Sequence, residues 1–423
     1  MRTNTFGHSS QSRGSMRSIL EHHLWVCSGQ SSVIQIMRIS AGSLQLPKRK
    51  NTEPNVKREK KHVTKYTRLR DRDAIITKEG IIFRVYGYNH PPNAYVCDPE
   101  YAPQAVYKST LSKAIRKAPD QEQVFHKFYF DQGLRFVEKN YSEYTLFYAP
   151  LEARLVGVRQ EQIKVTRSPQ QRFNKLIANP PKDKLIRSLK TLFTMLKTRA
   201  TLSVNDFGVF GSLLHGFYHP KYSDLDLIVY GKEKHEELGQ LLEQIYREKH
   251  STLRNEFEND AVIRGKHWLF KNYTPKEYVW HQRRKLIYAV FKDQSSKRVM
   301  KAEFEPVRDW HEIKNEYSRK QRITREGWVR AQARVTEDKD APFMPSIYRI
   351  EPLEILTKAK TEGIKRILSY VEEFRIQAKK DEKVVVEGNL EKVATAKGSF
   401  HQITLTYGPR YYEQVLKVAR PEP

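Results

Sequence analysis

Apolar residues recur at helical spacing in three segments of the chain. In the first segment, apolar side chains from Leu185 to Leu196 follow one another three or four positions apart. Side chains at this spacing lie on one face of an α-helix. The pattern predicts a helix over residues 182–197, and similar patterns predict helices over 235–249 and 276–291.

Shorter runs rich in Ile, Val and Phe predict strands. Residues 74–77 and 81–87 form two such runs on either side of the Gly-containing turn 78–80, which is the pattern of a β-hairpin. Residues 368–374 fit either a helix or a strand. Further strands are predicted over 207–210, 298–304, 384–388 and 403–406.

The order of these elements in a chain of 423 residues indicates several folded units. Residues 1–67 lack apolar periodicity and carry runs of Lys and Arg, so we expect an unstructured basic extension there. After it we expect an N-terminal α+β module at 68–175, a central domain at 176–335 and a C-terminal β-rich module at 340–423.

The first 46 residues contain a single acid, Glu21, among many Ser, Arg and Gln residues. This composition fits an organelle transit peptide. It fits equally well an unstructured extension, or a start codon placed upstream of Met16 or Met37. We expect one of the latter two.

The chain is strongly basic, with 76 Lys and Arg against 49 Asp and Glu and a net charge of +27. Residues 1–70 alone hold 14 of the basic residues and 3 of the acids. Such a charge attracts polyanions, so nucleic acid (RNA or DNA) is an expected partner. A basic tail without a specific ligand would give the same net charge.

Two features bear on the compartment. The chain has only two cysteines, Cys27 and Cys97, too few for a disulfide framework or a multi-cysteine zinc site. No stretch approaches the roughly 18 continuous apolar residues of a membrane span. We therefore expect a reducing, cytoplasmic location and no membrane partner.

One segment, residues 210–231, combines the residue types of a phosphate and metal site. A predicted strand runs into Gly211 and Ser212, and a second strand opens with Asp224 and Asp226. Glycine lets the backbone approach a ligand, and free N–H groups at the start of a helix favour phosphate at Ser212. Because residues two apart share a strand face, Asp224 and Asp226 can hold hard cations together.

The spacing of Gly211-Ser212 and Asp224-Leu225-Asp226 resembles the polymerase-β-like nucleotidyltransferase superfamily, over about residues 205–310. The predicted hairpin at 72–85, with His90-Pro91 after it, is similar to a group of archaeal predicted nucleotidyltransferases. The resemblance implies an α/β (α+β) fold with a mixed sheet in the core. It also implies Ser212 as a phosphate ligand, Asp224 and Asp226 as metal ligands, and two Mg²⁺ ions as cofactors.

The superfamily takes a third carboxylate from a later strand, where Glu303 and Glu305 lie on one face. We expect Glu303 to be the catalytic and metal-binding residue, because apolar residues flank it, with Glu305 as its substitute. Glutamate departs from the commoner aspartate, and an exposed face pairing glutamate with Lys301 is the alternative. Without a third acid the domain would bind nucleotide and turn over slowly.

Other residues are weaker candidates, each with a structural alternative. Arg284 and Lys285 are expected to bind nucleotide phosphates, although a solvated basic helix face explains them equally well. His215 and His219 stand four apart, as helical metal ligands do, but Pro220 favours a loop. Two aromatic pairs have the potential to stack on bases, with core packing as the alternative: Phe83 with Tyr86, and Tyr411 with Tyr412.

These features predict an enzyme that moves a nucleoside monophosphate from an NTP to an acceptor hydroxyl and releases pyrophosphate. A nucleic-acid end is the favoured acceptor because of the positive charge. The alternative is a non-catalytic nucleic-acid-binding protein that keeps the same fold. The chain has no Gly-x-x-x-x-Gly-Lys-Ser/Thr loop and no dinucleotide-binding fingerprint.

Overall fold

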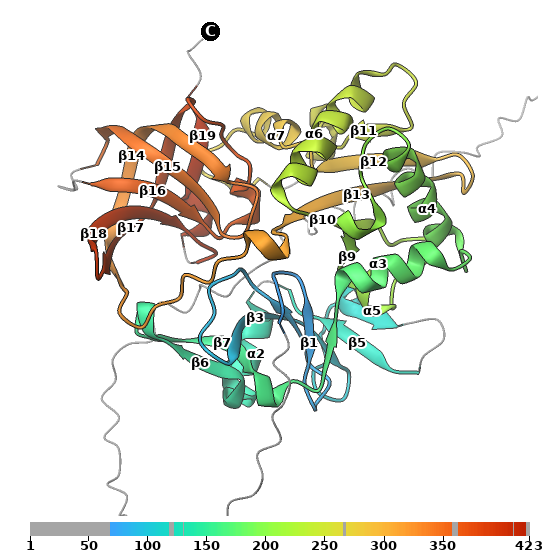
Figure 1. The fold of residues 1–423 in the computed structure, drawn as a ribbon, viewed down its shortest axis with the longest axis horizontal. Coiled ribbons are helices and arrows are strands. Elements are labelled where there is room, and N and C mark those ends of the chain that lie inside the picture. The colour runs from blue at the N-terminus through green and yellow to red at the C-terminus, as the bar shows by residue number, and fades with distance from the viewer. Residues whose placement is uncertain are drawn as a thin grey trace, which may run out of the picture.

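The computed structural model describes residues 68–117, 122–129, 131–264, 268–357, 363–408 and 410–419. The predicted extension at 1–67 lies outside the described residues. Within the described part of the chain, strands form three sheets of eight, five and six strands. Each sheet has its own hydrophobic core, so the protein is a mixed α+β structure of three units (Figure 1).

The central sheet has the order β11-β12-β13-β10-β9, and only β10 and β13 pair in parallel. Leu225, Leu227 and Val229 point to one face, where side chains from four helices pack with them in a single core. Alternation along β10 leaves Asp226 on the other face. The elements are α3 (Pro169–Ala178), α4 (Lys184–Lys197), β9 (Phe207–Val209), α5 (Gly211–His215), β10 (Leu225–Tyr230), α6 (Lys232–Arg247), β11 (Leu253–Asn255), α7 (Pro275–Arg284), β12 (Tyr288–Asp293) and β13 (Arg298–Val307).

The N-terminal module lies below the central sheet in Figure 1 and contains the predicted hairpin. Ala74 pairs with Arg84 and Ile76 with Ile82 in an antiparallel register. The core of this module contains aromatic and β-branched side chains from several strands and from its one α-helix in the described residues. The elements are β1 (Ala74–Ile76), β2 (Ile82–Val85), β3 (Ala94–Pro103), β4 (Ile115–Lys117), β5 (Val124–Lys127), α2 (Gln132–Asn140), β6 (Thr145–Tyr148), β7 (Ala153–Arg159) and β8 (Val165–Arg167).

The C-terminal module is a closed barrel. Its long first strand, β14, pairs with β15 along one part and with β17 along another, which closes the order β14-β15-β16-β18-β17-β14. Among the described strands of the barrel, only β16 and β18 are parallel. This is the strand order of the five-stranded Greek-key barrel known as the OB-fold. The strands are β14 (Arg322–Asp340), β15 (Ser346–Ile355), β16 (Ile364–Ser369), β17 (Lys383–Thr395), β18 (Gly398–Leu405) and β19 (Val415–Val418), the last of which adds to β17.

Several predicted elements differ from the structure. The helix predicted over 276–291 is wrong in its second half, because α7 ends at Arg284 and Tyr288–Asp293 is strand β12. Leu286 has a φ of 55°, which breaks the helix, and β12 then pairs with strands on both sides. The ambiguous segment 368–374 ends strand β16 and continues into a short 3₁₀ turn. Strand β14 starts at Arg322, so the barrel begins before residue 340.

No helix in the described part of the chain is both long and apolar enough to cross a membrane.

Candidate active site

The parallel pairing of β10 and β13 brings two of the predicted acids side by side. Asp226 is directly opposite Glu303 in the register of the two strands. Asp224 immediately precedes β10, and its Oδ1 accepts a hydrogen bond of 3.3 Å from the backbone N–H of Lys301 on β13. Asp224, Asp226 and Glu303 therefore form one cluster at the edge where both strands carry acids, which we call the carboxylate edge.

The turn that starts at Gly211 lies against this edge. The backbone N–H of Phe210 donates to the carbonyl oxygen of Asp226 at 3.1 Å. Gly211 has a φ of 57°, and a Cβ placed on it would lie 2.8 Å from Oδ2 of Asp226. Glycine is therefore required here for two reasons, its left-handed backbone and its lack of a side chain.

Ser212 follows in helix α5, which has only five residues. A helix this short has a weak dipole, so the sequence argument from a helix terminus applies only in part. What remains is the local geometry, in which Gly211 and Ser212 face the same cavity as the carboxylate edge.

That cavity has a volume of about 540 Å³ and an opposing basic wall. On one side are Gly211, Ser212 and the three acids of the carboxylate edge. The other side comes from the N-terminal module, whose strands β4 and β5 contribute half of its cations. These lining cations are Arg72, Arg84, Lys113, Arg116, Lys117 and Lys127. The cavity thus combines groups suited to cations with groups suited to phosphates.

The acids of the carboxylate edge are held in an unfavourable electrostatic environment. Burial, followed by the charge of Asp224, raises the pKa of Asp226 to about 7. Burial and the neighbouring Glu305 and Asp226 raise the pKa of Glu303 well above its usual value. Among the described residues, no lysine or arginine lies within 4 Å of these three carboxylates to form an ion pair. A bound cation would relieve this repulsion.

Glu305, two residues beyond Glu303, is in the opposite situation. It is buried, and Arg375 of the barrel donates to both of its carboxylate oxygens, one of them at 2.6 Å. Arg72 of the N-terminal module lies 3.1 Å from Glu305 and 2.8 Å from Glu372. The arginines lower the pKa of Glu305 to about 2. We call Arg72, Glu305, Glu372 and Arg375 the ion network, and it joins all three units.

Comparison with known proteins matches the central part of the chain to a family. The family model of the nucleotidyltransferase domain covers residues 184–323, from α4 to the start of β14. Residues 184–323 form a nucleotidyltransferase domain. An uncharacterized protein of Methanocaldococcus jannaschii is 24% identical over 356 residues, which are 84% of this chain and 100% of that protein. No solved structure matches the chain.

The nucleotidyltransferase domain supports a general nucleotidyl-transfer function, and the cavity described above lies against its central sheet. No group of three or more His, Cys, Asp or Glu side chains in the described ranges is arranged to hold a metal ion by itself. The carboxylate edge nevertheless fits a divalent cation, because its acids are buried close together and burial raises the pKa of each. Oxygens of a bound nucleotide would supply further ligands.

Two predicted nucleotide ligands lie away from this cavity. Arg284 pairs with Glu382 of the barrel and lies over the Trp280 ring, at 4.3 Å from the ring centroid. Lys285 is buried and donates to the carbonyl oxygen of Glu373. Neither lines the cavity. Both face the barrel because the helix that carries them ends there, so their predicted role in nucleotide binding is not supported.

The other candidates have structural roles. His215 is buried and contacts Phe217 and Tyr101, whereas His219 packs on Tyr222 at the cavity mouth. Phe83 and Tyr86 belong to the core of the N-terminal module. Tyr411 and Tyr412 contact each other and Phe270 beside the barrel.

Sequence reasoning missed the basic wall of the cavity. Four of its cations lie in residues 113–127, a mixed segment without clear periodicity. The one available signal was a local excess of Lys and Arg between predicted strands. Burial and Arg116 lower the pKa of Lys127, while Asp226 across the cavity favours its charged form.

Proposed function

We propose that the protein is a metal-dependent nucleotidyltransferase of the polymerase-β type that transfers a nucleoside monophosphate from an NTP to an acceptor hydroxyl. The observation that carries the proposal is the shared cavity of Gly211-Ser212, the carboxylate edge and the basic wall. This combination brings phosphate-binding groups and cation-binding groups together within one site. The family match to residues 184–323 supports the same reaction class.

The residues of this chain would divide the work between binding and orientation. The backbone at Gly211 and Ser212, with Lys127 and Arg116 opposite, would hold the triphosphate. Asp224, Asp226 and Glu303 would hold two Mg²⁺ ions, which supply charge neutralisation at the phosphates and activation of the acceptor hydroxyl. The core behind β10 fixes these carboxylates, because Leu225, Leu227 and Val229 anchor the strand.

In the proposed reaction, the acceptor oxygen attacks the α-phosphorus of the NTP and forms a new phosphoester bond. The bond from the α-phosphorus to its bridging oxygen breaks, and pyrophosphate leaves with the electron pair. A carboxylate of the edge takes the proton of the hydroxyl. Glu303 is the candidate for this role, because it lies directly opposite Asp226 in the sheet and lines the cavity.

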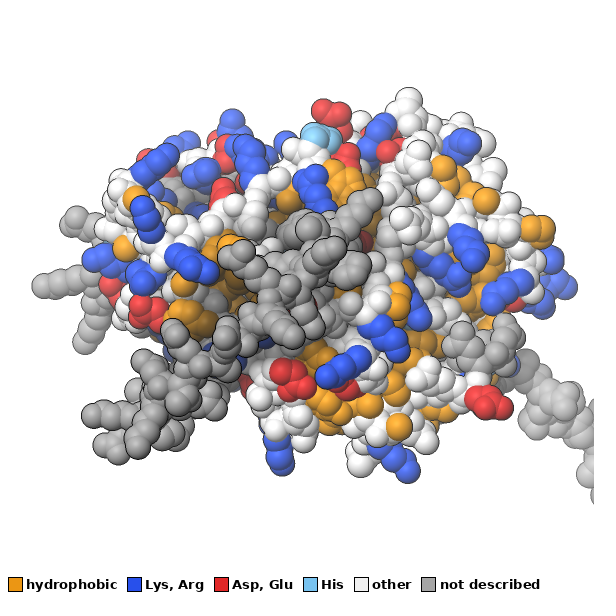
Figure 2. All heavy atoms as spheres, turned by 60° about the horizontal axis from the view of Figure 1, so that its bottom comes forward, with side chains coloured by type: hydrophobic (Ala, Val, Ile, Leu, Met, Phe, Trp, Pro, Cys, Tyr) orange, Lys and Arg blue, Asp and Glu red, His pale blue; other side chains and the backbone are white. Residues whose placement is uncertain are grey.

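The positive charge favours a nucleic-acid end as the acceptor. Figure 2 shows the face that carries the N-terminal module, where Lys and Arg side chains are spread between hydrophobic patches and a few acids. The barrel supports the same choice, since OB-folds commonly bind oligonucleotides. A cavity of about 350 Å³ lies beside it, where the Arg366 guanidinium is 5.1 Å from the Phe400 ring centroid.

Labelled NTP tests the proposal. Each of the four NTPs, labelled at the α-phosphate, is incubated with Mg²⁺ and a panel of RNA, DNA and protein acceptors. We expect label on a nucleic-acid acceptor, and its loss in Asp224→Asn/Asp226→Asn. The control Glu143→Gln/Glu233→Gln removes two charges from exposed positions outside the cavity and should behave as wild type.

Two outcomes would contradict the proposal. If Asp224→Asn/Asp226→Asn still transfers the label, these two aspartates are not the catalytic residues. Nucleic-acid binding without any transfer would favour the alternative, a binding protein that retains the fold. We include this alternative because no three His, Cys, Asp or Glu side chains in the described residues are arranged to hold a metal ion by themselves.

A further inference from the structure

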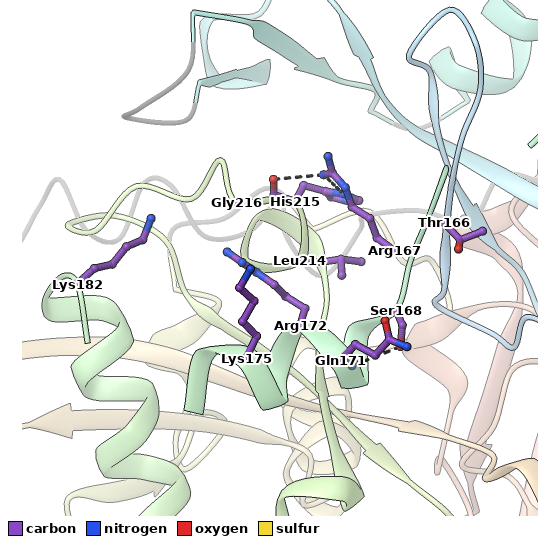
Figure 3. Close-up of a pocket in the computed structure, with 10 residues that line it drawn as sticks. All are labelled: Thr166, Arg167, Ser168, Gln171, Arg172, Lys175, Lys182, Leu214, His215 and Gly216. Carbon is purple, nitrogen blue, oxygen red and sulfur yellow. Dashed lines mark hydrogen bonds between the residues drawn. The ribbon is translucent and has the colours of Figure 1, made fainter. Parts of the chain in front are cut away.

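A second hollow lies at the far end of helix α5. It has a volume of about 500 Å³, and strand β8, helix α3, Lys182 and the end of α5 line it. Four of its ten lining residues are Lys or Arg, and none of the ten is Asp or Glu. Figure 3 shows these cations, with Arg172 and Lys175 ending close together and Arg167 and Lys182 on either side. We call this hollow the α5 groove.

The two arginines of the α5 groove are held in place by hydrogen bonds to backbone carbonyl oxygens and not by carboxylates. Arg167 donates to the carbonyl oxygen of His215 at 3.2 Å, and Arg172 donates to that of Leu213 at 3.2 Å. Both are half-buried, Arg167 also lies 3.0 Å from Nδ1 of His215, and the described residues that line the groove include no carboxylate. Burial, followed by the charge of Arg172, lowers the pKa of Arg167. Half-buried cations without counter-charges favour an anionic ligand.

The α5 groove adjoins the candidate active site. Gly211 and Ser212 at the start of α5 line the active-site cavity, and Leu214, His215 and Gly216 at its end line the groove. A helix of five residues is about 7 Å long, so the two hollows lie close together. His215 Nε2 also lies 3.9 Å from Oε2 of Glu100, which lines the active-site cavity. A ligand in the groove is thus next to the reacting groups.

We propose that the α5 groove binds the phosphodiester backbone of the acceptor nucleic acid, next to the end that receives the nucleotide. The acceptor role rests on the proposed function, whereas the binding of a strand does not. Cations from separate elements around one hollow suit a chain of phosphates better than a single one. The NTP has its own basic wall in the other cavity, so the groove is left for the acceptor.

Salt-dependent binding of a fluorescein-labelled single-stranded RNA tests this proposal. The variant is Lys175→Gln/Lys182→Gln, because both lysines are exposed and their loss spares the arginine contacts with α5. The matched control is Lys139→Gln/Lys249→Gln, which removes two exposed lysines elsewhere. Anisotropy titrations between about 50 and 200 mM salt give affinity and its salt slope.

We expect the groove variant to bind RNA about tenfold more weakly. Its slope of log affinity against log salt should fall by about 1.4, since each lost phosphate contact on a single strand contributes about 0.7. The control should match wild type, and fluorescent NTP should bind all three proteins equally. Equal RNA binding by the two double variants would overturn the proposal.

Two more arms separate other ligands and keep the two proposals distinguishable. Displacement of RNA by inorganic phosphate at matched ionic strength, or loss of NTP affinity in the groove variant, would assign the groove to free phosphate or nucleotide instead. Asp224→Asn/Asp226→Asn should still bind RNA. One outcome would separate the two proposals: neither wild type nor any variant transfers label, yet the groove variant alone loses RNA affinity. In that case the catalytic proposal fails and the groove assignment stands.

Discussion

The carboxylate edge and the ion network both include a glutamate of strand β13, and the two glutamates lie in opposite electrostatic environments. Glu305 is enclosed by Arg375 and Arg72, and its pKa falls to about 2. Glu303, two residues earlier on the same face, faces other acids, and its pKa rises. A buried acid with matched arginines serves the structure, whereas crowded acids without them need a ligand. The contrast separates joining residues from candidate catalytic ones.

The largest expected effect is on stability, in Glu305→Gln. The change leaves Arg375 and Arg72 buried with less counter-charge, and breaking a buried pair costs about 3–5 kcal/mol. Chemical denaturation should show this loss in the free energy of unfolding. A loss below about 1 kcal/mol would mean that the ion network does not hold the units together, and the comparison would fail.

Glu303→Gln should show the reverse behaviour. Its stability should equal or exceed that of wild type, because the substitution removes a repelled carboxylate. Transfer of label should fall by about 10²–10³-fold, the usual loss when one group that stabilises a transition state is removed. Turnover and melting temperature are measured on the same preparation. Full activity in Glu303→Gln would shift the third-acid role to another residue.

A smaller effect concerns pH. The folded pKa of Asp226 is about 7 and its ordinary value is 3.8, so the folded state binds more protons between these values. Stability of the metal-free protein therefore falls as pH rises through this window. Asp226→Asn removes this dependence and should gain about 2 kcal/mol over wild type from pH 5 to pH 7, at about 1.4 kcal/mol per unit. Melting curves at both pH values, with Mg²⁺ chelated, give the difference.

Added Mg²⁺ provides the control for the pH experiment. It should stabilise wild type at pH 7 and have a smaller effect on Asp226→Asn, because a ligand of the folded state raises its stability. An identical response in both proteins would place the cation elsewhere.

The smallest expected effect is in Arg284→Gln. This residue pairs with Glu382 on the barrel and does not line the active-site cavity. We expect a KM for NTP within about twofold of wild type and a stability loss of at most about 1 kcal/mol, as for partly exposed ion pairs. A large rise in KM would restore the role that the sequence suggested and would require the site to extend toward the barrel.

The sequence alone could predict the parts of the site that are local in the chain. The spacing from Ser212 to Asp224 and the alternation along β10 sufficed to bring Gly211 and Asp226 together, because β9 and β10 are consecutive paired strands joined by α5 and a loop. The hairpin at 74–85 and helices α4 and α6 were likewise predicted from periodicity.

Other parts depend on residues far apart in the chain. Alternation puts Glu303 and Glu305 on one face, but only the position of Arg375, 70 residues later, distinguishes them. The basic wall requires strands β4 and β5 to be folded over the cavity, which no local pattern indicates. Arg284 and Lys285 were proposed for their charge alone, and the sequence does not show that the end of α7 places them against the barrel.

The ion network also has a practical consequence for dissecting the protein. A fragment cut to residues 184–323 would keep Glu305 and lose both Arg72 and Arg375, exposing an acid-rich seam and the apolar flank of the sheet. Removal of the barrel alone would deprive Arg72 of its ion pair with Glu372. The smallest piece worth expressing for crystallisation or enzymology therefore runs from the N-terminal module through the barrel.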